Sequence, residues 1–131
     1  MSFALDVSKF VEKAKKNPEK VMRQVSIKLF SAIIKASPVD TGRFRMNWMA
    51  SGGTPAFGTT DATDKSGNTA TGNATSFVLK AADWREFTLT NNLPYAQRLE
   101  YGWSQQAPQG FVRVNVSRFQ QLINEEANKV K

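Results

Sequence analysis

Two pairs of closely spaced carboxylates are the residues of this sequence whose types acid–base chemistry would need. Asp83 lies three residues before Glu86, and Glu125 directly precedes Glu126. Hydrolysis of a glycosidic bond needs two carboxyl groups facing one cleft, about 5–9 Å apart. Spacing along the chain does not establish such a cleft, and adjacent residues of a helix point in different directions. We therefore predict structural roles for these carboxylates.

The 131 residues include no histidine and no cysteine. Ser-His-Asp and Cys-His nucleophilic sites are thereby excluded, as are zinc sites built on imidazole or thiolate. Asp61 and Asp64 superficially suggest a calcium site, but the residues around them lack the ligand order and the final Glu of an EF-hand loop. The sequence predicts a protein that is not an enzyme and that uses no metal or cofactor.

Positive charge is concentrated in the first part of the chain. The formal net charge is +7, and residues 1–36 carry eight basic against three acidic side chains. On a helix, one face would hold a basic row, composed of Lys9, Lys13, Lys16, Lys20 and Arg23. Such a row suits DNA phosphates or an acidic protein partner, but it is more often simply a solvated helix face. No helix-turn-helix or basic-zipper pattern accompanies it.

The first third of the sequence has the periodicity of an amphipathic helix. Apolar residues recur at spacings of three and four from Val7 to Ala36. Asn17 and Pro18 suit an N-cap and a first helical position, while the apolar face keeps its phase across Pro18. We expect either one kinked helix or a short helix leading collinearly into a longer one, ending before Pro38.

The middle of the chain predicts two strands separated by a long loop. A turn over 38–42 precedes a strand over 43–50, in which Phe44, Met46, Trp48 and Ala50 alternate with polar residues. Residues 51–75 are rich in Gly, Thr and Ala and predict a flexible loop. Residues 76–82 favour a short helix over a strand. The second strand is expected over 85–90, with Phe87 and Leu89 directed inward.

Two more helices are expected near the C-terminus. Residues 94–101 predict a short helix that Gly102 caps. Residues 111–129 predict a final helix, although its first residues also alternate as a strand would. We therefore expect a single α+β domain over residues 1–131, with long N-terminal and C-terminal helices packed on a small antiparallel sheet with a long inserted loop.

Large aromatic residues are numerous for a chain of this size. We expect Trp48 and Tyr95 in the core, and Trp103, beside the polar residues 104–106, in a protein interface. The sequence contains no apolar run of the roughly 18 residues that a membrane span requires. It predicts a soluble protein made in the cytoplasm.

Two segments resemble the small neck or minor tail-component family of long-tailed phages. The family patterns are P-V-D-T-G-x-[LF]-R and N-x-x-x-Y-A-x-x-[LV]-E-[YF]-G, and this sequence has Pro38-Val39-Asp40-Thr41-Gly42-Arg43-Phe44-Arg45 and Asn91-Asn92-Leu93-Pro94-Tyr95-Ala96-Gln97-Arg98-Leu99-Glu100-Tyr101-Gly102. The resemblance extends over about residues 10–130. Residues 51–75 and Gln105-Gln106 have no counterpart in the family pattern.

The resemblance implies a virion structural protein at the head–tail junction. It would join tail to head as one subunit of a homo-oligomeric ring, in contact with connector, head-closure or tail-terminator rings and with packaged DNA. A tail terminator that caps the tail tube and a small basic nucleic-acid-binding module are the alternatives. The resemblance also implies structural roles for the matching motif residues, Asp40, Thr41, Gly42, Tyr95, Glu100 and Gly102.

Overall fold

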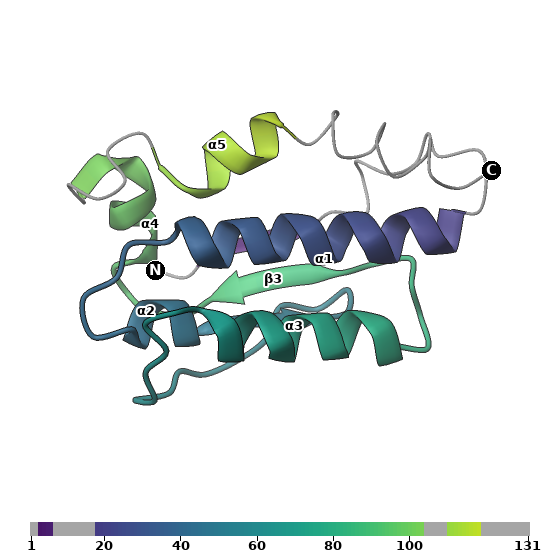
Figure 1. Ribbon diagram of the computed structural model, residues 1–131, viewed down its shortest axis with the longest axis horizontal. Helices are drawn as coiled ribbons and strands as arrows, with labels where there is room; N and C mark the ends of the chain where they lie inside the picture. The colour runs from purple at the N-terminus through teal and green to yellow at the C-terminus, as the bar shows by residue number, and fades with distance from the viewer. Residues whose placement is uncertain (1–2, 7–17, 104–109, 119–131) are drawn as a thin grey trace.

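The computed structural model describes residues 3–6, 18–103 and 110–118 (Figure 1). Several predictions concern residues outside these ranges, namely the helix before Pro18, the side chains of Lys9, Lys13, Lys16, Glu125 and Glu126, and most of the C-terminal helix. Over the described residues the protein has an α+β fold, as the sequence predicts, in which two helices, α1 and α3, pack with a small antiparallel sheet.

The sheet has three short strands, β1 (Phe3–Asp6), β2 (Trp48–Ser51) and β3 (Thr88–Asn91), in the order β1-β3-β2. Both pairings are antiparallel, and Trp48 and Ala50 lie opposite Asn91 and Leu89. The central strand β3 is buried along its whole length. The sequence indicated β2 and β3 approximately, but β1 was not predicted.

Helix α1 (Pro18–Ala36) forms the centre of the molecule and contacts both α3 and α5 (Figure 1). Its described residues begin at Pro18, with Glu19 in the first turn and Lys35 in the last. Its buried residues recur at helical spacing along one face: Val21, Met22, Val25, Ser26, Leu29, Phe30, Ile33 and Ile34. The predicted end before Pro38 is confirmed, and the Ser37 hydroxyl donates to the Ile33 carbonyl at 2.7 Å.

Helix α3 (Asn68–Lys80) corrects the prediction of a loop over 51–75, which is wrong for residues 68–75. Thr, Asn and Gly are poor helix formers, so intrinsic propensity argues against this helix. Packing overrides propensity here, because Ala70, Ala74 and Val78 form a buried stripe on α3, which contacts α1. Small residues on such a stripe let two helices approach closely. The connection between β2 and α3 is therefore residues 52–67.

Helix α2 (Arg43–Met46) lies where a strand was predicted. Gly42 has a positive φ of 93° and its carbonyl accepts from the Met46 amide at 3.1 Å, which starts a helical turn before β2. Phe44 and Trp48 still share the core because a spacing of four residues also suits a helical turn. Asn47, one of the polar residues in the predicted alternation, is fully buried.

The C-terminal part of the described chain differs from prediction in two details. The short helix over 94–101 consists of α4 (Ala96–Arg98) and the π-helical η2 (Leu99–Trp103), so Gly102 lies inside a helix rather than capping one. Helix α5 (Val112–Ser117) is short, and its first residues are not a strand. The remainder of the predicted range 111–129 lies outside the described residues.

The core combines aliphatic residues of α1 with an aromatic cluster. Phe44, Trp48 and Phe111 meet edge to face, with ring centroids 5.5–6.2 Å apart. Trp48 is buried as predicted, and its indole N–H donates to the Ser37 hydroxyl at 2.8 Å. Tyr95 is half-buried and packs against this core. The inward orientation of Phe87 and Leu89 is confirmed, since neither is exposed.

Candidate protein interface

The turn of the first motif is held by the contact between Gly42 and the end of the 52–67 connection. The Gly42 carbonyl accepts from the Asp64 amide at 3.0 Å. A Cβ at Gly42 would lie 2.5 Å from the Lys65 amide nitrogen, so the position has no room for a side chain. The Thr41 hydroxyl oxygen accepts from the Arg43 amide at 3.2 Å, and Asp40 is exposed. The first motif thus brings two separate chain segments into contact.

Both arginines of the first motif donate to backbone carbonyls. The Arg45 guanidinium donates to the Lys35, Ser37 and Lys65 carbonyls at 2.8, 3.0 and 2.6 Å. Arg43 donates to the Thr60 carbonyl at 3.1 Å and forms an ion pair with Asp61 at 3.3 Å. These contacts join the end of α1 to the second half of the 52–67 connection.

Asn47 adds a second attachment for the same connection. Its amide group donates to the Thr60 carbonyl at 3.0 Å, and its carbonyl oxygen accepts from the Thr60 amide at 2.9 Å. Asn47 is itself fully buried, so these contacts satisfy the polar atoms of a side chain that water does not reach. The connection is therefore held at residue 60, and the Asn92 side-chain amide also donates to the Ala56 and Gly58 carbonyls at 2.8 and 3.2 Å.

Asp64 accepts hydrogen bonds at the start of α3. Its carboxylate accepts from the Gly67 and Ala70 amides at 3.1 and 2.8 Å and from the Ser66 hydroxyl at 3.2 Å. Burial disfavours ionisation of Asp64, but these hydrogen bonds outweigh it and hold the pKa of the carboxyl below its ordinary value. Within the described ranges, no group of three or more acidic side chains is placed to hold a metal ion.

The two motif segments are adjacent in the structure although about fifty residues separate them in the sequence. The Asn91 side-chain NH₂ group donates to the Phe44 backbone carbonyl at 3.0 Å, and the Asn91 side-chain oxygen Oδ1 accepts from the Leu93 amide at 3.2 Å. The rings of Phe44 and Tyr95 lie 6.0 Å apart. The motifs therefore form one packed unit at one end of α1.

Glu100 of the second motif holds the start of α5. Its side chain is completely buried, and its carboxylate accepts from the Phe111, Val112 and Arg113 amides at 2.7–2.9 Å. The Arg113 guanidinium donates to the same carboxylate at 3.2 Å and to the Glu100 carbonyl at 2.8 Å. A negative charge suits this position because the first amides of a helix have no partners within the helix.

Gly110 makes the approach of Glu100 possible. It has a φ of 91°, and a Cβ there would lie 2.6 Å from a carboxylate oxygen of Glu100. The motif prediction singled out Glu100 but not its partners Gly110 and Arg113. The sequence holds a weak signal for them, since a glycine before the start of a predicted helix suits a close backbone approach.

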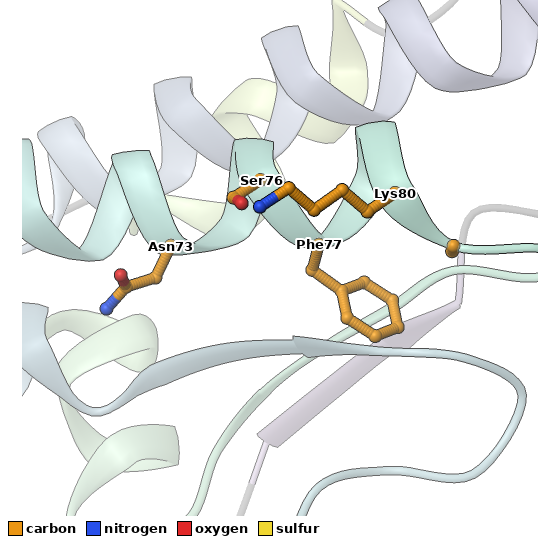
Figure 2. Close-up of a pocket in the computed structure, with 5 residues that line it drawn as sticks. Asn73, Ser76, Phe77 and Lys80 are labelled. Carbon is orange, nitrogen blue, oxygen red and sulfur yellow. The ribbon is translucent and has the colours of Figure 1, made fainter.

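An open groove lies between α3 and β2. Figure 2 shows Phe77 directed from α3 towards the neighbouring strand and loop, with Asn73 on the same side of the helix. Two cavities share these residues. One, of about 400 Å³, is lined by Asn73, Ser76, Phe77, Lys80 and Ala81. The other, of about 480 Å³, is lined by Met46, Trp48, Met49, Ala50, Ala56, Thr60, Asn73 and Phe77.

The groove is mainly apolar and lies beside an exposed aromatic side chain. Phe57 is 89% exposed, although its neighbours Ala56 and Thr60 line the second cavity. Phe77 is 36% exposed and meets Phe87 edge to face at 6.3 Å. Exposed aromatic residues beside an apolar groove are typical of protein contact surfaces. The sequence did not predict this groove, because it forms only where residues of α3, β2 and the 52–67 connection come together.

The structure changes the interpretation of the predicted basic row. Arg23 is mostly buried and donates to the Val78 and Ala81 carbonyls at 2.5 and 2.9 Å, at the C-terminal end of α3. It also pairs with Glu19 at 3.1 Å. Arg23 therefore caps α3 rather than contributing to an exposed face, while Lys20 is exposed. Lys9, Lys13 and Lys16 lie outside the described residues.

The remaining predicted residues show no shared site. Asp83 and Glu86 are both exposed, and Asp83 accepts from the Arg85 amide at 2.9 Å in a local turn. The side chain of Trp103 is not among those described. Gly102 belongs to η2, one residue after the exposed Tyr101, whose ring lies 4.6 Å from the Arg113 guanidinium carbon.

No family model, curated protein or solved structure matches this chain. Among the described residues, no helix has both the length and the apolar character needed to cross a membrane.

Proposed function

We propose that this protein is a virion structural protein at the head–tail junction of a tailed phage, where it joins tail to head as one subunit of a ring. The proposal starts from the resemblance of residues 38–45 and 91–102 to the neck and minor tail-component family. It includes contact with connector, head-closure or tail-terminator rings, and with packaged DNA.

The observation that carries the proposal is the use of the motif side chains. Asn91, Arg45 and Glu100 all direct their polar groups at backbone amides or carbonyls. Polar groups engaged in this way hold chain segments against one another, so they stabilise the fold of the subunit. Such motifs suit a subunit that presents shaped surfaces to neighbours, because they hold the connection 52–67 and α5 in defined positions.

Electron microscopy of lysates from a phage whose copy of this gene is interrupted tests the proposal. Filled heads separate from complete-looking tails are the expected result, and supplying the intact gene in trans should restore joined particles. Normal infectious particles would overturn the proposal. Heads joined to tails of abnormal length would instead favour the tail-terminator alternative.

Binding to duplex DNA tests the nucleic-acid alternative directly. A DNA-binding module should bind at about physiological salt, and its affinity should fall steeply as salt rises. The purified subunit proposed here should bind DNA weakly. Tight, salt-sensitive binding together with normal particles from the interrupted phage would favour the DNA-binding function.

A further inference from the structure

We infer that the outer edge of β2 is a docking site for an extended, uncharged segment of another protein, which adds to the sheet as a further strand. The inference deepens the proposed function and rests on it for the identity of the partner, since a neighbouring virion protein would supply the segment. Its physical basis is separate. Strand β2 (Trp48–Ser51) lies at an edge of the sheet, and the cavity of about 480 Å³ follows that edge.

Strand β2 has a second side besides the one that faces β3. Alternate residues of a strand direct their N–H and C=O groups to opposite sides, so β2 has backbone groups on the side away from β3. Within the described residues, no strand pairs with that side. Proteins commonly protect such an edge with charged residues or proline, yet the sequence of β2 is Trp-Met-Ala-Ser and contains neither. The edge therefore suits the addition of a strand.

The cavity lies along this edge rather than on one face of the sheet. Successive side chains of a strand point to opposite faces, and Trp48, Met49 and Ala50 all line the cavity. A cavity that contacts side chains of both faces passes around the edge of the strand. An added strand would lie in the same place, about 4.8 Å from β2.

Two other elements line the cavity and would contact the side chains of the added strand. Asn73 and Phe77 come from α3, and Figure 2 shows both on the side of the helix that faces the neighbouring strand and loop. Ala56 and Thr60 come from the 52–67 connection, where Asn92 holds the Ala56 carbonyl. Backbone hydrogen bonds give affinity in strand addition, and contacts of the alternate side chains give specificity.

The lining residues favour an uncharged segment. None of the residues that line this cavity is charged, and a charge taken out of water without a partner is costly. Nucleic acid is a poor occupant for the same reason, because the cavity offers its phosphates no cation. Phe57, which is 89% exposed beside the cavity, adds an aromatic surface that the docked segment would cover.

The described part of the chain favours a different protein as the source of the segment. Its longest uncharged stretch outside helices and strands is residues 52–60. Asn47 and Asn92 already hold this stretch through the backbone of residues 56, 58 and 60. It is therefore engaged in its own fold and does not suit donation to a second copy.

Titration with synthetic peptides, followed by NMR of the backbone amides, tests strand addition. The probe is a short peptide of alternating valine and threonine with blocked ends. The control peptide has the same sequence with N-methyl groups on successive residues, so that neither of its edges can donate hydrogen bonds. The probe should shift the amide signals of residues 48–51, 73 and 77, and the control should bind at least about 10-fold more weakly. Equal binding of the two peptides, or no shift in β2 with the probe, would overturn the inference.

A charge placed in the cavity tests its location. Asn73→Lys introduces a charge at an exposed lining position without removing a buried group, and it should weaken binding of the probe about 10-fold. Leu79→Lys is the matched control, because Leu79 is 56% exposed on the same helix and lines neither cavity. Circular dichroism verifies that each variant folds. Binding that both variants weaken equally, or that Asn73→Lys leaves unchanged, would contradict the proposed site.

The outcomes separate this inference from the proposed function. Failure of the peptide experiments would overturn the inference whatever the microscopy of the interrupted phage shows. Specific peptide binding together with normal particles from that phage would support the docking site and remove the role at the head–tail junction. Self-association of the purified protein that the probe inhibits would make a second copy the occupant and would overturn the choice of a different protein.

Discussion

Glu100→Gln is the substitution that most directly tests how the second motif stabilises the fold. One carboxylate oxygen accepts from the Phe111 and Val112 amides, and the other accepts from the Arg113 amide and guanidinium. A glutamine amide has one acceptor and one donor group. Whichever way it is oriented, its NH₂ group faces two N–H donors, and the buried site offers them no water.

The loss of stability in Glu100→Gln follows from the N–H donors that are left without an acceptor. Hydrogen bonds to a charged group each contribute about 1.5–3 kcal/mol, and the charge at the start of a helix adds up to about 2 kcal/mol in a buried setting. The Arg113 guanidinium is half exposed, so hydration of this group recovers part of the lost hydrogen-bond energy. We therefore expect a loss of about 3–5 kcal/mol in the free energy of unfolding, as for other broken buried ion pairs.

Urea denaturation followed by circular dichroism measures this loss. Glu86→Gln is the matched control, because Glu86 is exposed and its substitution should change stability by no more than about 0.5 kcal/mol. Hydrogen exchange adds a local measurement, in which the Phe111 and Val112 amides should lose protection more than those of α1. A loss below about 1 kcal/mol for Glu100→Gln would refute the capping role.

Three further substitutions test other parts of the structure. Gly42→Ala should reduce the free energy of unfolding by about 3 kcal/mol or more, because the left-handed φ and the Lys65 amide 2.5 Å away both oppose a Cβ; a thermal shift below about 2 °C would contradict this. The ionised Asp64 carboxylate stabilises the fold fully above its unfolded pKa, and this contribution is lost as the pH falls through its lower folded pKa. The difference in free energy of unfolding between wild type and Asp64→Asn should therefore be largest above about pH 5 and shrink below it. A difference that grows on acidification would contradict this role of Asp64. Ser37→Ala should cost about 1–3 kcal/mol, because it leaves the buried Trp48 indole N–H without this acceptor; urea denaturation would show no change if water replaced the hydroxyl.

The parts of the fold that the sequence predicted are those set by local signals. Helix α1 has an apolar face of large residues, a proline at its first position and a proline after its end, and each of these acts within a few residues. The burial of Trp48, Phe87 and Leu89 followed in the same way from alternation near short strands. Strong periodicity in the sequence was therefore sufficient to predict an element where its buried side chains are large.

The missed elements depend on contacts between distant residues. The stripe of α3 consists of Ala70, Ala74 and Val78, whose spacing of four is present in the sequence but whose small apolar area is hidden among Thr, Asn and Gly. Only the proximity of α1 makes this stripe favourable. Helix α2 was missed for a related reason, since alternation over five residues does not distinguish a strand from a helical turn that begins at a left-handed glycine.

The candidate site was predictable in its motif residues but not in its surfaces. The resemblance singled out Gly42, where a Cβ has no room, and Glu100, whose carboxylate accepts from the first amides of α5. Their partners, Lys65 and Gly110, come from segments whose positions depend on the completed fold. The groove could not be predicted from the sequence, because it exists only when α3 and β2 lie side by side in the completed fold.

Buried motif residues and exposed groove residues should give different phenotypes in the assembled particle. A substitution at Gly42 or Glu100 acts through folding, so it lowers the amount of folded subunit and any loss of particles follows from that loss. A substitution at Phe57 or Asn73 changes an exposed side chain and leaves the core intact. The proposed assembly role therefore predicts variants that remain folded as monomers at normal abundance and yet yield no joined particles. If every variant that blocks joining also unfolds the monomer, then the fold alone explains the phenotype, and the surface between α3 and β2 has no part in assembly.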